Sequence, residues 1–308
     1  MTLAPIRIGT RGSPLALAQT HIVEAMLLAA HPALREPGAI EIIVIRTTGD
    51  RVLDRPLADV GGKGLFSKEI DEAMLDGRID LGVHSIKDLP TWLPPGLLLA
   101  AVLPREDPRD VLIGGATNIA SLPQGAVVGT SSPRRQAQVL AFRPDLRVAL
   151  LRGNVHTRLR KVAEGAVTAT LLALAGLRRL DLPAVGAVLE PEEMLPAVGQ
   201  GAVGVTCRGD DEELRALLAM IDHAGSSCEV TAERAMLAAL DGSCRTPIGG
   251  LARRDAGEAL SLRGLVARPD GTQLLRADRL GGFGDAEAMG RDLGCELRTR
   301  AGDGFFAE

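Results

Sequence analysis

The stretch 80–90, DLGVHSIKDLP, combines a short apolar run with a carboxylate and an ammonium group close behind it. Residues 81–83 are few enough for a buried strand, and Pro90 prevents that strand from continuing in a central position of a sheet. Lys87 and Asp88 then follow the carboxyl end of a strand, where open α/β sheets bind ligands. A carboxylate beside an ammonium group can transfer protons there and hold a cation. The alternative is a solvent-exposed ion pair, which contributes little to stability.

A second candidate ligand contact follows a strand that we expect at residues 6–8. The segment 9–14, GTRGSP, provides a helix N-cap at Ser13 and a proline at the first helical position. A helix starting there would run to about residue 30 and would offer free backbone N–H groups to an anion. Arg11 would add a guanidinium to the same site. Helix capping without any ligand is the alternative explanation of Ser13.

The same pattern recurs in the second part of the chain. A strand expected at residues 127–128 leads into the segment 129–135, GTSSPRR. Ser132 again suits a helix N-cap, and Arg134 and Arg135 stand next to it. Two similar strand-to-helix turns favour two similarly built lobes, the alternative being chance recurrence of the two dipeptides.

Further arginines follow the other strands expected in this part of the chain. Arg152 comes after a strand at 147–151, Arg158 lies one turn into the next helix, and Arg179 follows a strand at 169–174. Each arginine alone is explained as a scattered surface residue, but their shared position after strand ends favours a ligand site. The planar guanidinium binds both oxygens of a carboxylate, so a carboxylate-bearing ligand is predicted.

Residues 54–64, DRPLADVGGKG, form an expected loop with three glycines and Lys63. The loop does not match the phosphate-binding pattern G-x-x-x-x-G-K-[ST]. We therefore favour a flap over a site, and an ordinary flexible loop is the alternative. A helix at 67–76, stopped by Gly77, is expected to follow.

The chain changes character from Ser227 onward. A helix at 229–240 is followed by consecutive strands with short turns, which predict a separate antiparallel α+β domain. Cys244 lies in the turn before these strands, next to Arg245, and a partly exposed thiol near a cation is reactive. Cys207 and Cys295 are expected to be core thiols. The three strands are expected at 248–253, 259–267 and 272–280, and a final helix at 285–300.

The composition restricts the possible function classes. A chain of 308 residues is long enough for two or three domains, and its 46% hydrophobic and 24% charged content is typical of a globular protein. The 2% aromatic content and the net charge of −4 disfavour a nucleic-acid-binding protein. No membrane-spanning run or signal peptide is recognised, so we expect a cytoplasmic protein without disulfides. The spacing of histidine and cysteine matches no zinc site, and no metal is expected.

Taken together in order, these segments resemble the hydroxymethylbilane synthase (porphobilinogen deaminase) family over essentially the whole chain. So many motifs at matching spacing make the resemblance specific. The matching segments are 10–16 (TRGSPLA), 60–66 (VGGKGLF), 84–88 (HSIKD), 105–110 (REDPRD), 129–135 (GTSSPRR), 151–155 (LRGNV), 195–201 (LPAVGQG) and 242–249 (GSCRTPIG).

The resemblance implies an α/β fold with two lobes like those of solute-binding proteins (type II periplasmic-binding-like). A C-terminal α+β domain with a three-stranded antiparallel sheet would follow. Lobe 1 is expected at 1–103, completed by a returning segment at 200–219 that periodicity alone does not reveal. Lobe 2 is expected at 104–199 and the C-terminal domain at 220–308.

The resemblance also implies the reaction. The family is a transferase of tetrapyrrole (haem) biosynthesis that joins four porphobilinogen molecules head to tail, releases ammonia, and hydrolyses the product to hydroxymethylbilane. It does so on a dipyrromethane primer bound to a cysteine through a thioether, which corresponds here to Cys244. Asp88 corresponds to the catalytic carboxylate. The family members are monomers, which sets our expectation for this chain.

Other site residues are carried over from the family motifs by position. Cofactor contacts are expected from Lys87, Ser132, Arg134, Arg135 and Arg152. Substrate contacts are expected from Arg11, Ser13, Arg152, Arg158, Arg179 and Gln200, and the active-site loop is expected to contribute Lys63 and Phe66.

Three positions depart from the pattern expected of the family. They are Asp59, Thr168 and Pro133, of which Asp59 puts one loop contact in doubt. Two other classes remain as alternatives: a two-lobed binding protein for small carboxylates, and a nucleotide-binding enzyme that uses the glycine-rich loop. The absence of a recognised export signal and the presence of Cys244 count against the first. The absence of Walker and G-x-G-x-x-G motifs counts against the second.

Overall fold

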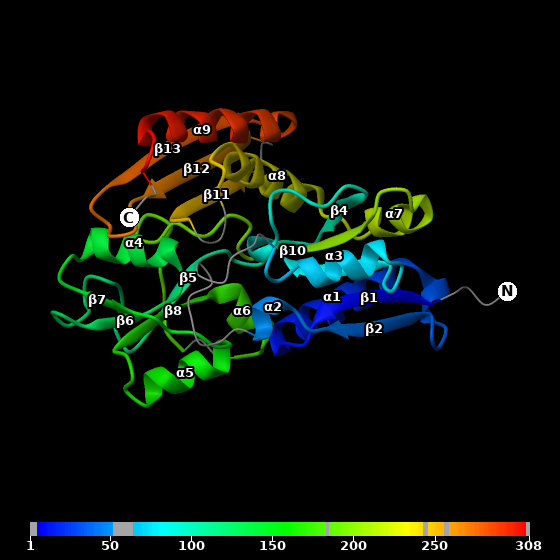
Figure 1. The fold of residues 1–308 in the computed structure, drawn as a ribbon, viewed down its shortest axis with the longest axis horizontal. Helices are drawn as coiled ribbons and strands as arrows, with labels where there is room; N and C mark the ends of the chain where they lie inside the picture. The colour runs from blue at the N-terminus through cyan, green and yellow to red at the C-terminus, as the bar shows by residue number, and fades with distance from the viewer. Residues whose placement is uncertain (1–4, 52–63, 183–184, 243–245, 256–258, 306–308) are drawn as a thin grey trace. The chain divides into compact units, whose positions relative to one another are not determined.

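The computed structural model describes residues 5–51, 64–182, 185–242, 246–255 and 259–305 (Figure 1). The chain divides into two compact units by its internal contacts. Unit 1 consists of residues 1–105 and 202–227, and unit 2 consists of residues 106–201 and 228–308. Because unit 1 contains two separated parts of the sequence, the chain leaves this unit and later returns to it.

Among the described residues, unit 1 contains a mixed five-stranded sheet. Its first three strands are parallel, and the returning strand is antiparallel to both of its neighbours. The β-branched Ile and Val residues of these segments pack well on a pleated surface, which favours strands here. The strands lie in the order β2 (Ile40–Ile45), β1 (Ile6–Arg11), β3 (Leu81–Ser85), β10 (Val203–Arg208) and β4 (Leu97–Val102).

The sheet of unit 2 repeats this plan in the described part of the chain. One strand, at residues 127–129, is parallel to both of its neighbours, and another, at residues 110–113, is antiparallel to both of its own. The prediction of two similarly built lobes is thereby confirmed. The order is β7 (Arg147–Ala149), β6 (Val127–Gly129), β8 (Ala169–Ala173), β5 (Asp110–Ile113) and β9 (Ala187–Val188).

The helices that follow β1 in unit 1 and β6 in unit 2 begin at the predicted caps. Ser13 accepts a hydrogen bond from the backbone N–H of Ala16 at 3.2 Å, and Ser132 accepts one from Arg135 at 3.4 Å. A proline occupies the first helical position in both cases, where its missing N–H costs nothing. The helices of unit 1 are α1 (Pro14–Ala30), α2 (Thr48–Arg51), α3 (Lys68–Leu75) and α7 (Glu212–Ala219). The helices between the strands of unit 2 are α4 (Pro133–Phe142), α5 (Val155–Ala163) and α6 (Leu174–Arg179).

A three-stranded antiparallel sheet forms the C-terminal part of unit 2, as predicted. Helix α8 (Ala224–Ala239) precedes the sheet and α9 (Ala286–Ala301) follows it. The two helices approach closely because Gly290 of α9 has no side chain, and a Cβ there would overlap with the carbonyl oxygen of Ala232. The strands are β11 (Ile248–Arg254), β12 (Ala259–Ala267) and β13 (Leu274–Gly282).

Several boundaries differ from the predicted ones. Helix α8 begins at Ala224, five residues earlier than expected, and residues 97–102 form a strand that the sequence reading had passed over. Cys295 is exposed, so the prediction of a core thiol is wrong. The reason is the helical period, because α9 buries Met289, Leu293 and Leu297, and position 295 lies on the opposite face.

The other described thiols are buried. Burial raises the pKa of Cys207 to about 11, so it is an inert core thiol, as expected. Cys228 donates a hydrogen bond to the carbonyl of Phe283 at 3.3 Å. No helix in the described ranges is long and apolar enough to cross a membrane.

A buried carboxylate in α3 generates a prediction about stability. Asp71 is only 5% exposed, and burial raises its pKa from 3.8 to about 6. The folded protein therefore holds this proton more tightly than the unfolded chain does, and stability falls as the pH rises from about 4 to above 6. Asp71→Asn should stabilise the protein by about 2 kcal/mol at pH 8 and by little at pH 4. Urea denaturation at the two pH values measures this difference.

Glu72→Gln is the matched control for Asp71→Asn, because Glu72 is an exposed residue of the same helix. It should change stability by less than about 0.5 kcal/mol at either pH. An equal effect of Asp71→Asn at pH 4 and pH 8 would show that ionisation of Asp71 carries no penalty.

Candidate active site

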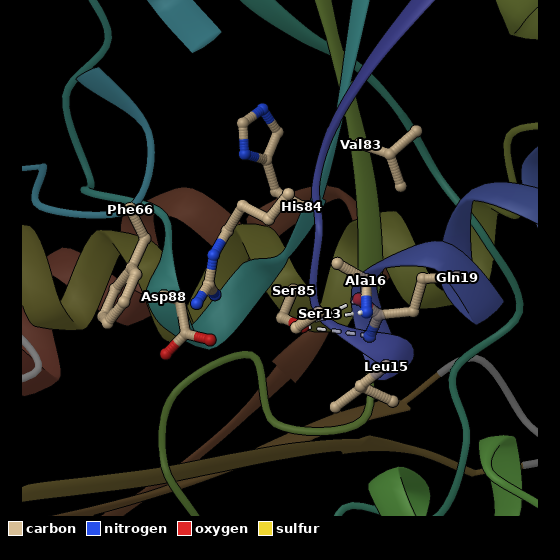
Figure 2. Close-up of a pocket in the computed structure, with 10 residues that line it drawn as sticks. Ser13, Leu15, Ala16, Gln19, Phe66, Val83, His84, Ser85 and Asp88 are labelled. Atoms are coloured by element: carbon tan, nitrogen blue, oxygen red, sulfur yellow. Dashed lines mark hydrogen bonds between the residues drawn. The ribbon is translucent and has the colours of Figure 1, made fainter. Parts of the chain in front are cut away.

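A pocket in unit 1 opens where β1 ends, α1 begins and β3 ends (Figure 2). Since β1 and β3 are parallel neighbours, their carboxyl ends meet at one edge of the sheet, where α/β proteins bind ligands. The pocket brings together several predicted site residues that are far apart in the sequence. Its functional side chains are those of Arg11, Ser13, Gln19, Phe66, Ser85 and Asp88.

Asp88 is held at the pocket by the backbone on both sides of it. Strand β3 passes directly into a short 3₁₀ helix, η3 (Ile86–Asp88), and the backbone N–H of Ile86 donates to the carbonyl of Ala202 at 3.1 Å. Ile86 and Leu89 are 1% and 4% exposed, so they anchor the turn in the core. Within the described residues, no hydrogen bond or ion pair engages the half-buried Asp88 carboxylate, which is left to bind a ligand.

Two polar side chains fix one wall of the pocket. The Gln19 amide donates to Ser85 Oγ at 2.9 Å, which joins α1 to the end of β3 (Figure 2). Gln19 is 3% exposed and Ser85 is half-buried. The sequence reading had not selected Gln19, since a glutamine on the buried face of a helix has no local signature of a site.

A stacked cation forms another part of the pocket. The Arg11 guanidinium lies over the ring of Phe66, 4.2 Å from its centroid. Such stacking favours a cation and restricts its orientation. Lys87 of η3 is half-buried and adjoins Asp88 in sequence, although it is not among the residues that line the pocket.

Two of the predicted arginines of unit 2 meet around a carboxylate that was not among the predicted site residues. Arg134 Nη1 lies 2.8 Å from Asp110 Oδ2, and Arg135 Nη2 lies 2.7 Å from Asp110 Oδ1. Gln200 also donates to Asp110 Oδ1, at 3.0 Å. We call these four residues the Asp110 cluster. All four are at least 95% buried.

The charges of the Asp110 cluster do not cancel. Burial alone would raise the pKa of Asp110, but the guanidiniums of Arg134 and Arg135 hold it well below its usual range. One carboxylate faces two guanidiniums, so the cluster keeps one net positive charge. The Nε–H groups of both arginines are also buried without a hydrogen-bond partner among the described residues. The donor set therefore has spare capacity for an anion.

The remaining predicted arginines contact the backbone of unit 2. Arg158 Nε donates to the carbonyl of Gly153 at 2.9 Å, and Arg179 Nη2 donates to that of Gly201 at 2.7 Å. Burial lowers the pKa of Arg179. Arg152 is half-buried and precedes α5.

Some of the residues singled out in the sequence cannot be placed, and one has a structural contact. Lys63 and Cys244 lie outside the described residues, as does Asp59. Thr168, one of the departures from the family pattern, accepts a hydrogen bond from the Val127 backbone through its hydroxyl at 3.1 Å. Its hydroxyl thus binds the backbone at the start of strand β6. No group of residues suited to hold a metal ion is present in the described ranges.

Comparisons with known proteins identify the family. The family model described as "Porphobilinogen deaminase, dipyromethane cofactor binding domain" matches residues 6–216, and "Porphobilinogen deaminase, C-terminal domain" matches residues 227–299. The chain belongs to the porphobilinogen deaminase family, so the resemblance seen in its motifs is confirmed.

Individual relatives match over nearly the whole chain. The porphobilinogen deaminase of Paracoccus denitrificans is 55% identical over 305 residues, which cover 98% of this chain and 96% of the relative. The chloroplastic porphobilinogen deaminase of Oryza sativa is 54% identical over 305 residues, covering 98% of this chain and 85% of the relative. These matches do not favour the binding-protein and nucleotide-enzyme alternatives.

Solved structures with a similar arrangement are more distant. The periplasmic aliphatic sulphonate-binding protein SsuA from Escherichia coli is 14% identical, with a TM-score of 0.42, over 78% of this chain and 71% of that protein. The BvgS VFT2 domain from Bordetella pertussis is 12% identical, with a TM-score of 0.41, over 71% of this chain and 85% of that domain.

The Asp110 cluster predicts a large and specific loss of stability. Asp110→Asn removes the carboxylate of the Asp110 cluster. The buried guanidiniums of Arg134 and Arg135 are then left without a counter-charge among the described residues. Breaking a buried ion pair in this way should cost about 3–5 kcal/mol, measured as a lowered urea midpoint. Asp145→Asn is the control, because Asp145 pairs with Arg143 at 2.6 Å on the surface and its loss should lower stability far less. Equal losses would contradict this account of the cluster.

Proposed function

We propose that this protein is a hydroxymethylbilane synthase, a transferase that joins four porphobilinogen molecules head to tail, releases ammonia and hydrolyses the product to hydroxymethylbilane. The observation that carries this proposal is the family match over residues 6–216 and 227–299. The pocket supports it, because it pairs a carboxylate with a guanidinium and an aromatic ring. A substrate with an acetate and a propionate on a pyrrole has complementary groups.

Asp88 is proposed as the catalytic residue. Loss of ammonia from porphobilinogen leaves a cationic, azafulvene-like pyrrole, and an adjacent carboxylate stabilises such a cation. The same carboxylate can take up and return protons at the pyrrole nitrogen. The buried neighbours Ile86 and Leu89 hold the turn, so Asp88 is in place before the substrate arrives.

The Asp110 cluster fits a cofactor that carries several carboxylates. Its surplus positive charge and its two Nε–H groups, which have no partner in the described part of the chain, are the features expected of a site for such an anion. When bound, dipyrromethane supplies the pyrrole carbon to which the first substrate is joined. We propose that Cys244 carries it through a thioether. Lys87, Ser132, Arg134, Arg135 and Arg152 would bind its acidic side chains.

A second set of residues, most of them arginines, is proposed to bind the carboxylates of the substrate. Arginines recognise them through two parallel N–H donors, which a lysine cannot supply. Lys63 and Phe66 are proposed as contributions of the active-site loop. The proposed substrate-binding residues are Arg11, Ser13, Arg152, Arg158, Arg179 and Gln200.

We also propose that the protein is a cytoplasmic monomer that needs no metal and binds neither nucleic acid nor membrane. The acidic net charge and the scarcity of aromatic residues support the absence of a nucleic-acid function. The division into lobe 1 (1–103 and 200–219), lobe 2 (104–199) and a C-terminal domain (220–308) stays a prediction.

Mass spectrometry tests the covalent cofactor. The purified protein should exceed its sequence mass by one dipyrromethane, and the extra mass should map to the peptide containing Cys244. Cys244→Ser removes the sulfur and should give the bare sequence mass, whereas Cys295→Ser should keep the modification. An unmodified Cys244 peptide from fully active enzyme would refute the assignment.

Asp88→Asn tests the catalytic carboxylate. The amide keeps the shape but loses the negative charge and the proton acceptor, so single-turnover elongation should slow by roughly 10²–10⁴-fold. Asp88→Glu should keep part of the activity because its carboxylate is displaced by only one methylene. Each variant is first verified by mass to carry the cofactor. Near-normal elongation by cofactor-loaded Asp88→Asn would place the catalytic carboxylate elsewhere.

A further inference from the structure

The stacked pair of Arg11 and Phe66 depends on a neighbouring glycine. A Cβ on Gly49 would overlap with the Phe66 ring, at both Cε1 and Cδ1, and would lie 2.9 Å from the carbonyl oxygen of Leu65. Gly49 lies in α2 and has no positive φ, so its backbone would accept alanine without strain. The glycine is therefore required mainly by the ring that lies against it, and also by the Leu65 carbonyl, but not by the helix.

Hydrogen bonds hold Gly49 and Phe66 next to each other. The backbone N–H of Gly49 donates to the carbonyl of Leu65 at 2.8 Å. Thr48 donates to Glu69 Oε1 twice, through its backbone N–H at 2.8 Å and its hydroxyl at 2.5 Å. These bonds tie the start of α2 to the start of α3.

We propose that Gly49 and Glu69 are positioning residues for the Arg11 guanidinium. Glu69 binds Thr48 and fixes the start of α2, Gly49 leaves room for the Phe66 ring, and the ring sets the plane of the guanidinium at the pocket. Arg11 is thereby held in a fixed orientation at the pocket for its proposed contact with a carboxylate of the incoming substrate. The identity of that substrate as porphobilinogen rests on the proposed function.

Gly49→Ala tests the space requirement in the cofactor-loaded enzyme labelled with 4-fluorophenylalanine. The chain has five phenylalanines, so the ¹⁹F resonance of Phe66 can be assigned by its loss in Phe66→Leu. Gly49→Ala should shift that resonance and raise the KM for porphobilinogen about 5–20-fold, with kcat changed less than about threefold, because guanidinium orientation contributes to binding. Gly284→Ala is the control, since a Cβ at Gly284 would meet no neighbouring atom within 4 Å.

Glu69→Ala tests the tie between the helices. It should reproduce the shift of the Phe66 resonance and the rise in KM, whereas Glu72→Ala on the same helix should change neither. Glu69→Gln should restore both, because its amide oxygen accepts the same two hydrogen bonds from Thr48. In a Phe66→Leu background, Glu69→Ala should have no further effect on KM, because both changes act through the same ring.

Specific results would overturn this inference. A Phe66 resonance unchanged in Gly49→Ala would show that the ring needs no glycine there. A shifted resonance with an unchanged KM, or a KM that rises without a shift, would show that Gly49 and Glu69 do not act through Arg11. Failure of the proposed function would look different, because the wild-type enzyme would then not convert porphobilinogen while the ¹⁹F shifts would still report the contact.

Discussion

Strand β10 is the element on which the geometry of the pocket depends. It lies between β3 and β4 and pairs with both, so it closes the sheet of unit 1 from a distant part of the chain. The residue just before it, Ala202, supplies the carbonyl that fixes Ile86 at the base of the η3 turn. An unpaired β3 would have a free edge and a loosely held Asp88. The backbone pairing of β10 with β3 therefore sets the position of Asp88 at the pocket.

The two units differ in how far their charged site residues are buried and in how these charges are compensated. In unit 1, Asp88 stays half-buried at a pocket, where a ligand can reach it. In unit 2, Arg134 and Arg135 are nearly inaccessible, and Asp110 compensates part of their charge. A buried guanidinium without a partner is costly, so the protein keeps an internal carboxylate at this position. The residual positive charge supports the proposed binding of an acidic cofactor by this cluster.

Local features could be predicted from the sequence with good precision. The N-caps at Ser13 and Ser132 and the repeat of strand, turn and helix depend on contacts within a few residues, and the structure confirms them. Asp110 and Gly49 could not be recognised in this way. Their importance arises from Arg135 and Phe66, which lie 25 and 17 positions away in sequence, and no periodic pattern encodes such contacts. The placement of β10 was available only through the resemblance to a family.

The sheet order of unit 1 has a consequence for how the chain is made. Strand β3 leaves the ribosome about 120 residues before its partner β10, a delay of roughly 6–24 s at ordinary translation rates. During that interval the ribosome produces the whole sequence of unit 2 between residues 106 and 201. Until β10 is made, the sheet of the nascent first unit has an unpaired edge between β3 and β4. An unpaired edge is a template for pairing with a wrong strand. Vectorial synthesis thus makes this protein dependent on protection of an unfinished sheet while its second unit is still being translated.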